Sequence, residues 1–315
     1  MPKQPLTTTE LNKIVKVIQS LYPIKYADSK WDNTGLLIDT SVPSPTSAAS
    51  ENNDICNPSF KVLLTNDLTS KVCDEAISRN CNLILAYHPF IFPSWKNISP
   101  NNNPQHKSCI KLIQKNISVY CPHTSVDAVP YGVNDWLCNS LVGVSAANID
   151  DAVISRTQVI EPIDGNAPAT HGYGRIVELV SSLPLNEIIG NIKSVLKIKH
   201  VQVAVPTNDN FLVKRIALCA GSGSGVFRSI SKREMDNIDL IYTGELSHHE
   251  ILKFKEMGKA VVLCNHSNTE RQYIKDIMTG LLSKELNKQN NGTDKETLNV
   301  SWIVSETDED PLVVV

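Results

Sequence analysis

The chain has 315 residues, which predicts two domains because most domains contain about 100–200 residues. Hydrophobic residues make up 41% and charged residues 20%, a composition that excludes the disordered class. The formal net charge of −3 gives no global attraction to nucleic acid or to an anionic membrane. No apolar run approaches the roughly 18–20 residues of a membrane span, and the first ten residues resemble neither a secretory signal nor a mitochondrial presequence. We expect a cytoplasmic protein, with the nucleus and the mitochondrion left open.

The cysteines predict buried, reduced thiols rather than a disulfide framework or a sulfur-ligated zinc site. No Cys-x-x-Cys pair occurs in the chain. Those in or beside apolar stretches are Cys73, Cys81, Cys109, Cys121, Cys138, Cys219 and Cys264.

The first half begins with an expected helix over residues 11–21, where Thr7 and Glu10 form a capping-box pattern. Residues 40–58 are rich in Ser, Pro and Asn and read as a surface insertion. Apolar strands are then expected at 62–64, 83–86 and 117–120, separated by helical patterns around 72–77 and 110–113. This alternation indicates βαβ units and a largely parallel sheet.

The second half repeats the theme, with a helix expected at 185–196 and a polar insertion or an over-long helix end at about 283–297. Its expected strands cover residues 175–179, 201–205, 216–219, 240–242 and 261–264. The sequence therefore predicts an α/β fold with two similar halves, 1–145 and 146–315, each with a mostly parallel sheet. In such folds ligands collect at the carboxyl ends of strands, so a site is expected there, between the halves.

Polar side chains that can bind a metal follow four of these strands. They are His88, His123 with Asp127, Glu245, and His266 with Glu270. Imidazole and carboxylate without thiolate form the ligand set of zinc, manganese or iron. His266 and Glu270 are four residues apart at an expected helix start, so they share one face. A helix-terminal histidine beside a surface glutamate that pairs with Arg271 is the alternative.

The order and spacing of several motifs resemble those of the NIF-three-like dinuclear-metal family, which includes bacterial YbgI and proteins labelled GTP cyclohydrolase type 2 homologues. The motifs run from the N-terminal half to the C-terminal half: Trp31–Leu36, Tyr87–Phe92, His123–Asp127, Gly132–Asp135, Gly174-Arg175, Gly221–Gly223, Tyr242–Glu245 and His266–Arg271.

The resemblance implies that His88, Asp127, His266 and Glu270 bind one or two divalent ions (Zn, Mn or Fe). Tyr87 stands where the family has a further histidine ligand, and a phenol with a pKa near 10 is a poor ligand unless the metal deprotonates it. One ion is therefore a firmer expectation than two. His123 and Glu245 are expected to act as a general base or to orient a ligand.

Two further motifs invite a functional interpretation. Gly221–Gly225 follows a strand, but it lacks the Lys-Ser/Thr of a phosphate-binding loop; anion contact and a tight strand–helix turn both remain open. His248 and His249 do not form the His-Glu-x-x-His pattern of zinc proteases, although one of them is a candidate to line the site.

Two functions follow from the resemblance. The first is metal-dependent hydrolysis of a small polar or nucleotide-like substrate, similar to that of GTP cyclohydrolase type 2. The second is a non-catalytic, metal-binding adaptor that interacts with a transcriptional co-regulator. The resemblance also implies a ring-shaped homo-oligomer, a hexamer being one such form.

Overall fold

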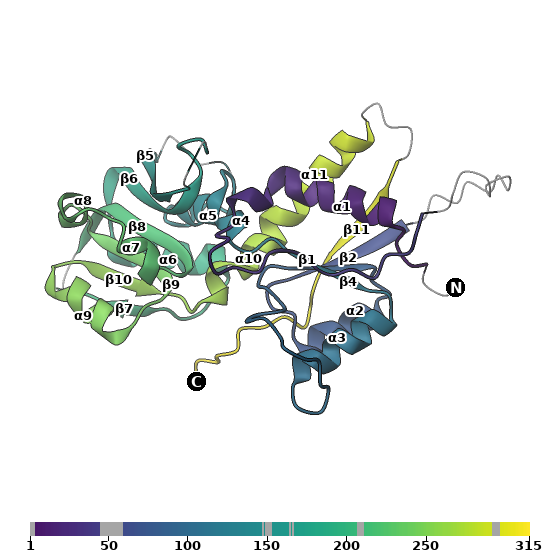
Figure 1. Ribbon diagram of the computed structural model, residues 1–315. Coiled ribbons are helices and arrows are strands. Elements are labelled where there is room, and N and C mark those ends of the chain that lie inside the picture. The colour runs from purple at the N-terminus through teal and green to yellow at the C-terminus, as the bar shows by residue number, and fades with distance from the viewer. Residues whose placement is uncertain are drawn as a thin grey trace. The chain divides into compact units, whose positions relative to one another are not determined.

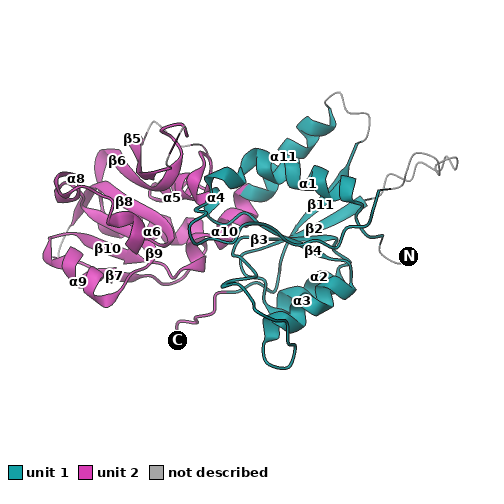
Figure 2. Cartoon of the chain, viewed as in Figure 1, with its two compact units in different colours: residues 1–125, 278–309 teal, residues 126–277, 310–315 magenta. Residues whose placement is uncertain are grey.

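The computed structural model describes residues 4–44, 59–146, 148, 153–163, 165, 167–206, 211–291 and 297–315. The chain forms two compact units, and neither is one continuous stretch of sequence (Figure 2). Unit 1 contains residues 1–125 and 278–309, and unit 2 contains residues 126–277 and 310–315. The expected division into 1–145 and 146–315 remains a prediction; unit 2 begins at residue 126, and the C-terminal helix and strand belong to unit 1.

Unit 1 is built on a five-stranded sheet in the order β1-β4-β3-β2-β11 (Figure 1). All neighbours are parallel except β1 and β4. The strands are β1 (Gly35–Ile38), β2 (Ser59–Thr65), β3 (Leu83–Ala86), β4 (Ser118–Cys121) and β11 (Asn299–Val304). The mostly parallel sheet predicted for this half is confirmed.

Two helix pairs cover the two faces of this sheet, α1 (Thr8–Leu21) with α11 (Thr279–Asn290), and α2 (Ser70–Ser78) with α3 (Pro104–Gln114) (Figure 1). The predicted capping box of α1 is present, since Thr7 and Glu10 bond each other's main-chain N–H groups. A short 3₁₀ helix, Ile24–Tyr26, follows α1. The polar stretch from residue 283 is helical as far as Asn290, and most of the predicted insertion at 40–58 lies outside the described residues.

Unit 2 contains a six-stranded sheet in the order β5-β6-β8-β9-β10-β7. Only the β8–β9 and β9–β10 pairs are parallel, so this sheet is mixed rather than mostly parallel. The first two strands of the unit, β5 and β6, are antiparallel and need no helical crossover between them. The strands are β5 (Ile154–Pro162), β6 (Gly172–Pro184), β7 (Gln202–Ala204), β8 (Leu212–Ser222), β9 (Leu240–Glu245) and β10 (Ala260–Leu263).

Helices pack along the sheet of unit 2, with α5 and α6 against β6 and with α9 against β10. The helical segments are α4 (Thr124–Ala128), α5 (Val133–Ser140), α6 (Leu185–Leu196), α7 (Ser224–Phe227), α8 (Lys232–Asp236), α9 (His248–Glu256) and α10 (Arg271–Tyr273), together with the 3₁₀ helix Ser267–Thr269 and the π-helical turn Ile274–Met278. One apolar core of this unit joins Ile241 and Val261 of the sheet to Phe227, Met235 and Phe254 of α7, α8 and α9.

The seven cysteines of the apolar stretches are buried and free of disulfides, as predicted. Cys56 lies outside the described residues. No helix in the described part of the chain is both long enough and apolar enough to cross a membrane.

Candidate functional site

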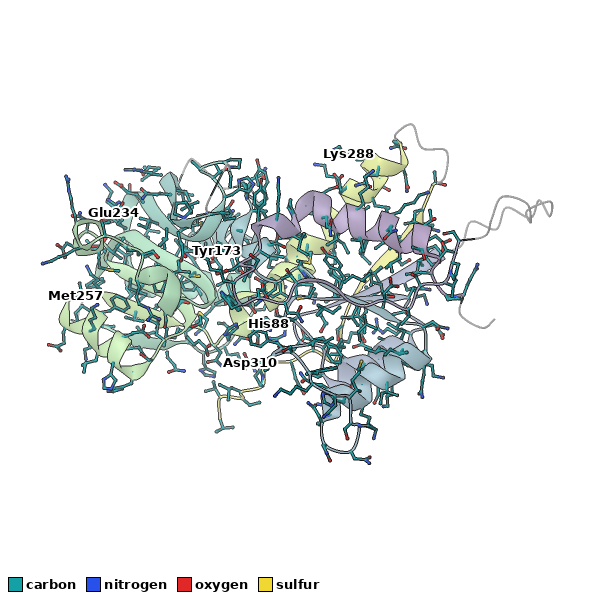
Figure 3. The ribbon with its side chains drawn as sticks, in the orientation of Figure 1. His88, Tyr173, Glu234, Met257, Lys288 and Asp310 are labelled. Carbon is teal, nitrogen blue, oxygen red and sulfur yellow. The ribbon has the colours of Figure 1, made fainter. Side chains whose placement is uncertain are left out.

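In unit 1, the candidate residues gather where β3 and β4 end. Tyr87 and His88 directly follow β3, and the main-chain N–H of Tyr87 donates to Thr65 at the end of β2. His123 lies two residues after β4, and its main-chain N–H donates to the carbonyl of Tyr87 at 3.2 Å. The ring centroids of His88 and His123 are 5.4 Å apart. The two predicted histidines of this half are therefore neighbours (His88 is labelled in Figure 3).

His88 is oriented by an aspartate that the sequence reasoning missed. Its Nδ1 lies 2.9 Å from Oδ1 of Asp67, and because a carboxylate only accepts hydrogen bonds, Nδ1 carries the proton. The lone pair is then on Nε2, the atom that a metal would bind. Asp67 comes two residues after β2, so its place at a strand end was the available signal.

His123 has the same arrangement with Asp32, 2.7 Å from Nδ1 to Oδ1. The hydroxyl of Thr124 also donates to Asp32, at 2.6 Å. Burial raises the pKa of the Asp32 carboxyl, but the hydrogen bond and charge of His123 and the hydrogen bonds of Thr124 outweigh it, and the pKa falls below its ordinary value. Asp32 is thus an ionised partner that fixes the proton of His123 on Nδ1, which gives the Trp-Asp-Asn motif a physical role.

Tyr87 is buried and 1% exposed. Its ring meets those of His88 and His123 edge to face, with centroid distances of 5.5 and 6.1 Å. The residue at the position of the missing family ligand therefore packs against both histidines of unit 1.

In unit 2, the candidate residues lie beyond β8, β9 and β10. His266 follows β10 after Asn265, which adopts the left-handed conformation (φ 66°) that asparagine tolerates. The segment that carries His266 and Glu270 is a 3₁₀ turn rather than the expected start of an α-helix. The two side chains still meet, with Nε2 of His266 3.5 Å from Oε1 of Glu270.

Glu245, at the end of β9, orients His266. Its Oε1 lies 2.8 Å from Nδ1 of His266, so Nδ1 donates to Glu245, and Nε2 is the ring nitrogen that faces Glu270. The Glu270 side chain is only 4% exposed, and a buried carboxylate needs a cation or hydrogen-bond donors. His266 and Glu270 both belong to a group of side chains that could hold a metal ion.

Gly221 leaves room beside these two ligand atoms. A Cβ on this residue would lie 2.8 Å from Nε2 of His266 and 2.9 Å from Oε1 of Glu270, and its φ of +61° also favours glycine. Its N–H donates to the hydroxyl of Thr269. The Gly221–Gly225 segment is therefore a strand–helix turn that borders the His266–Glu270 pair, and the four-residue α7 that follows is too short to favour the anion interpretation.

Asp127 also belongs to unit 2, and a hydrogen bond to its main-chain carbonyl holds it in place. The Nδ2 of Asn134 donates to the Asp127 carbonyl at 3.0 Å, while Oδ1 of Asn134 accepts from the N–H of Ala220. Burial raises the pKa of the Cys219 thiol, and the charges of Asp127 and Glu270 raise it further. The negative charges of Asp127 and Glu270 thus both raise the pKa of the same thiol, that of Cys219, near the end of β8.

The remaining motif residues of unit 2 have structural partners. Asp135 accepts a hydrogen bond from Nε of buried Arg175 at 2.7 Å, which joins α5 to β6. His248 and His249 are exposed at the start of α9, where their rings contact each other at 5.5 Å.

Each of His88, His266 and Glu270 offers an atom suited to bind a metal ion. The three histidines at strand ends share one design, a carboxylate on Nδ1 and a lone pair on Nε2. A carboxylate that accepts the Nδ1 proton of a histidine is typical of metal-binding histidines and of histidines that act as catalytic bases.

Comparison with known proteins agrees with this geometry. The family Duf34/NIF3 (NGG1p interacting factor 3) matches residues 9–311. The chain is 48% identical to NGG1-interacting factor 3 of Saccharomyces cerevisiae, over 98% of both chains. Two solved structures share the fold: a Staphylococcus aureus hypothetical protein (TM-score 0.73, 23% identity, 99% of this chain and 100% of that one) and protein ybgI (TM-score 0.65, 21% identity, 96% and 100%). The chain belongs to the NIF3 family, as its motifs predicted.

Proposed function

We propose that this NIF3-family chain is a metal-dependent hydrolase in which His88, Asp127, His266 and Glu270 bind a divalent ion. The observation that carries the proposal is the pair of potential ligand atoms in unit 2, Nε2 of His266 and Oε1 of Glu270, which lie 3.5 Å apart. Glu245 fixes the tautomer of His266, and Asp67 does the same for His88.

The residues fit a divalent ion of the zinc, manganese or iron class. The donor set is imidazole and carboxylate, and Gly221 keeps the space beside two of the donor atoms open. A bound ion of this class supplies Lewis acidity, which makes water a nucleophile near neutral pH.

His123 is the residue that we propose to hold and transfer a proton. Asp32 keeps its proton on Nδ1, so Nε2 accepts a second proton and Asp32 stabilises the resulting charge, as in other aspartate–histidine pairs. The substrate class that we propose, a small polar or nucleotide-like molecule, rests on the resemblance to GTP cyclohydrolase type 2 homologues.

The test of the metal site is the metal content of Glu270→Ala. We expect the variant to lose nearly all the metal that the wild type holds, measured by mass spectrometry on protein loaded with Zn²⁺ or Mn²⁺ and then desalted. Glu256→Ala, an exposed change at the end of α9, is the matched control. A full equivalent of metal in folded Glu270→Ala, with folding checked by circular dichroism, would refute the assignment of this ligand.

An adaptor function is the second candidate, because the yeast relative carries the name NGG1-interacting factor 3. In that case the ion stabilises a binding surface and the partner is a transcriptional co-regulator. A nucleotide panel assayed with the metal-loaded protein separates the two. Turnover that is lost in both Glu270→Ala and His123→Gln supports the hydrolase, whereas metal binding without turnover favours the adaptor. We also propose a homo-oligomer in either case.

A further inference from the structure

Unit 2 contains a cavity of about 390 Å³, formed by α7, α8, α9 and the residues that follow them. Its volume is within the range of about 300–1,000 Å³ found for small-molecule sites. None of the candidate metal ligands, and none of the three strand-end histidines, lines it. Figure 1 shows the three helices, and Figure 3 labels Met257, which follows α9 and belongs to the lining.

The floor of the cavity is apolar and well ordered by packing. Phe227, Met235 and Phe254 are at most 8% exposed and belong to the core of unit 2. The rings of Phe227 and Phe254 meet edge to face, with centroids 6.4 Å apart. Met257 is 39% exposed, and its flexible thioether adapts to the shape of a ligand. Such a floor favours an aromatic ring or a short acyl chain.

The rim of the cavity is cationic. Arg228, Lys232 and Lys253 are exposed and line it, and Nε of Arg228 is fixed by the carbonyl of Ser224 at 3.0 Å. Three cations against one carboxylate, Glu250, leave a net positive rim.

Glu250 offsets only one of these three positive charges, and its own hydrogen bonds hold it in place. Its Oε2 accepts from the hydroxyl of Ser224 at 2.7 Å and from the N–H and hydroxyl of Ser247, which completes the capping box of α9. The carboxylate is therefore part of the helix cap, and the ammonium groups of Lys232 and Lys253 are available to bind an anion.

We propose that this cavity binds a small apolar anion, an aromatic ring or short acyl chain that carries a carboxylate, sulfonate or phosphate. The apolar part lies on Phe227, Met235 and Phe254, and the anionic group meets Lys232 and Lys253. Charge complementarity between rim and ligand selects an anion over a neutral molecule of the same shape.

Two aromatic probes of matched shape test the proposal on the full-length protein. 8-Anilinonaphthalene-1-sulfonate carries the anion, and N-phenyl-1-naphthylamine lacks it. We expect the double variant Lys232→Gln/Lys253→Gln to weaken binding of the sulfonate about tenfold, the equivalent of 1.4 kcal/mol, and to change binding of the neutral probe less than twofold. Lys255→Gln, on α9 but outside the cavity, is the control and should change neither.

The four methionines of the chain locate the bound probe. In a spectrum of ¹³C-labelled methionine methyl groups, the sulfonate should shift Met235 and Met257, which line the cavity, and leave buried Met278 unmoved. Equal shifts of Met278, or unchanged sulfonate affinity in the double variant, would overturn the proposal. Probe binding that falls as the protein self-associates would also overturn it, because the cavity would then take a second copy of the chain.

Discussion

The substitution Gly221→Ala should damage the metal site more than its single added methyl group suggests. The new Cβ would lie 2.8 Å from Nε2 of His266 and 2.9 Å from Oε1 of Glu270, distances that real Cβ atoms do not show. At least one of these two side chains must therefore move. Shifts in the support of a metal ligand typically cost about 10–100-fold in metal affinity, and we expect a loss in that range.

The same substitution strains the backbone. A residue with a Cβ pays about 1–2 kcal/mol in the left-handed region that Gly221 occupies (φ +61°). For a unit of roughly 150 residues this lowers the melting temperature by about 2–8 °C. Gly225→Ala is the matched control in the same turn, because no atom lies within 4 Å of its Cβ position and its φ is ordinary.

Competition with a chromogenic chelator measures metal affinity, and differential scanning fluorimetry measures melting. The control should keep the wild-type affinity. If Gly221→Ala binds metal as tightly as Gly225→Ala does, the space beside His266 and Glu270 is not part of a metal site, and the reasoning fails.

The other predictions concern unit 1. Tyr87→His adds a nitrogen donor at the position of the missing family ligand, so metal content should rise from one ion towards two per chain. Tyr26→His is the control. Equal stoichiometry in the wild type and in Tyr87→His would show that Tyr87 does not limit binding of a second ion. Asp32→Asn should lower the free energy of unfolding by about 1.5–3 kcal/mol at pH 7, because a hydrogen bond to a charged group is lost. Since the pKa of Asp32 is lower in the folded protein, its contribution is present above the ordinary value of 3.8 and fades as the pH falls below it. Urea unfolding at pH 7 and pH 3 measures this, with exposed Asp39→Asn as control, and a gap between wild type and variant that stays constant with pH would contradict it.

Much of the fold could be predicted because the strands near the candidate residues are short apolar runs that can be recognised from their own residues. The strands β3, β4, β9 and β10 lie where the apolar runs predicted them. The missed strands are β1, β5 and β11; β5 pairs with the next strand along the chain, whereas β1 and β11 pair with distant strands. The pairing of β11 with β2, some 240 residues earlier, is a contact that no pattern in a single sequence reports.

The candidate site was predictable in its ligands and not in their supports. Imidazoles and carboxylates at strand ends are visible in sequence, and the family resemblance selected among them. Asp67 lies 21 residues from His88, and Asp32 lies 91 residues from His123. These partners are brought to their histidines by the order of the strands, which the sequence does not report directly.

The discontinuity of unit 1 has a consequence for how the protein is made. Its edge strand β11 and the helix α11 are synthesised only after all of residues 126–277. Domains fold as units while synthesis proceeds, so residues 126–277, which form most of unit 2, can fold on the ribosome while unit 1 still waits for its last strand. Until then β2 is an open edge with unpaired N–H and C=O groups, the kind of edge on which strands of other chains add. That edge stays open from the synthesis of β2 until β11 pairs with it.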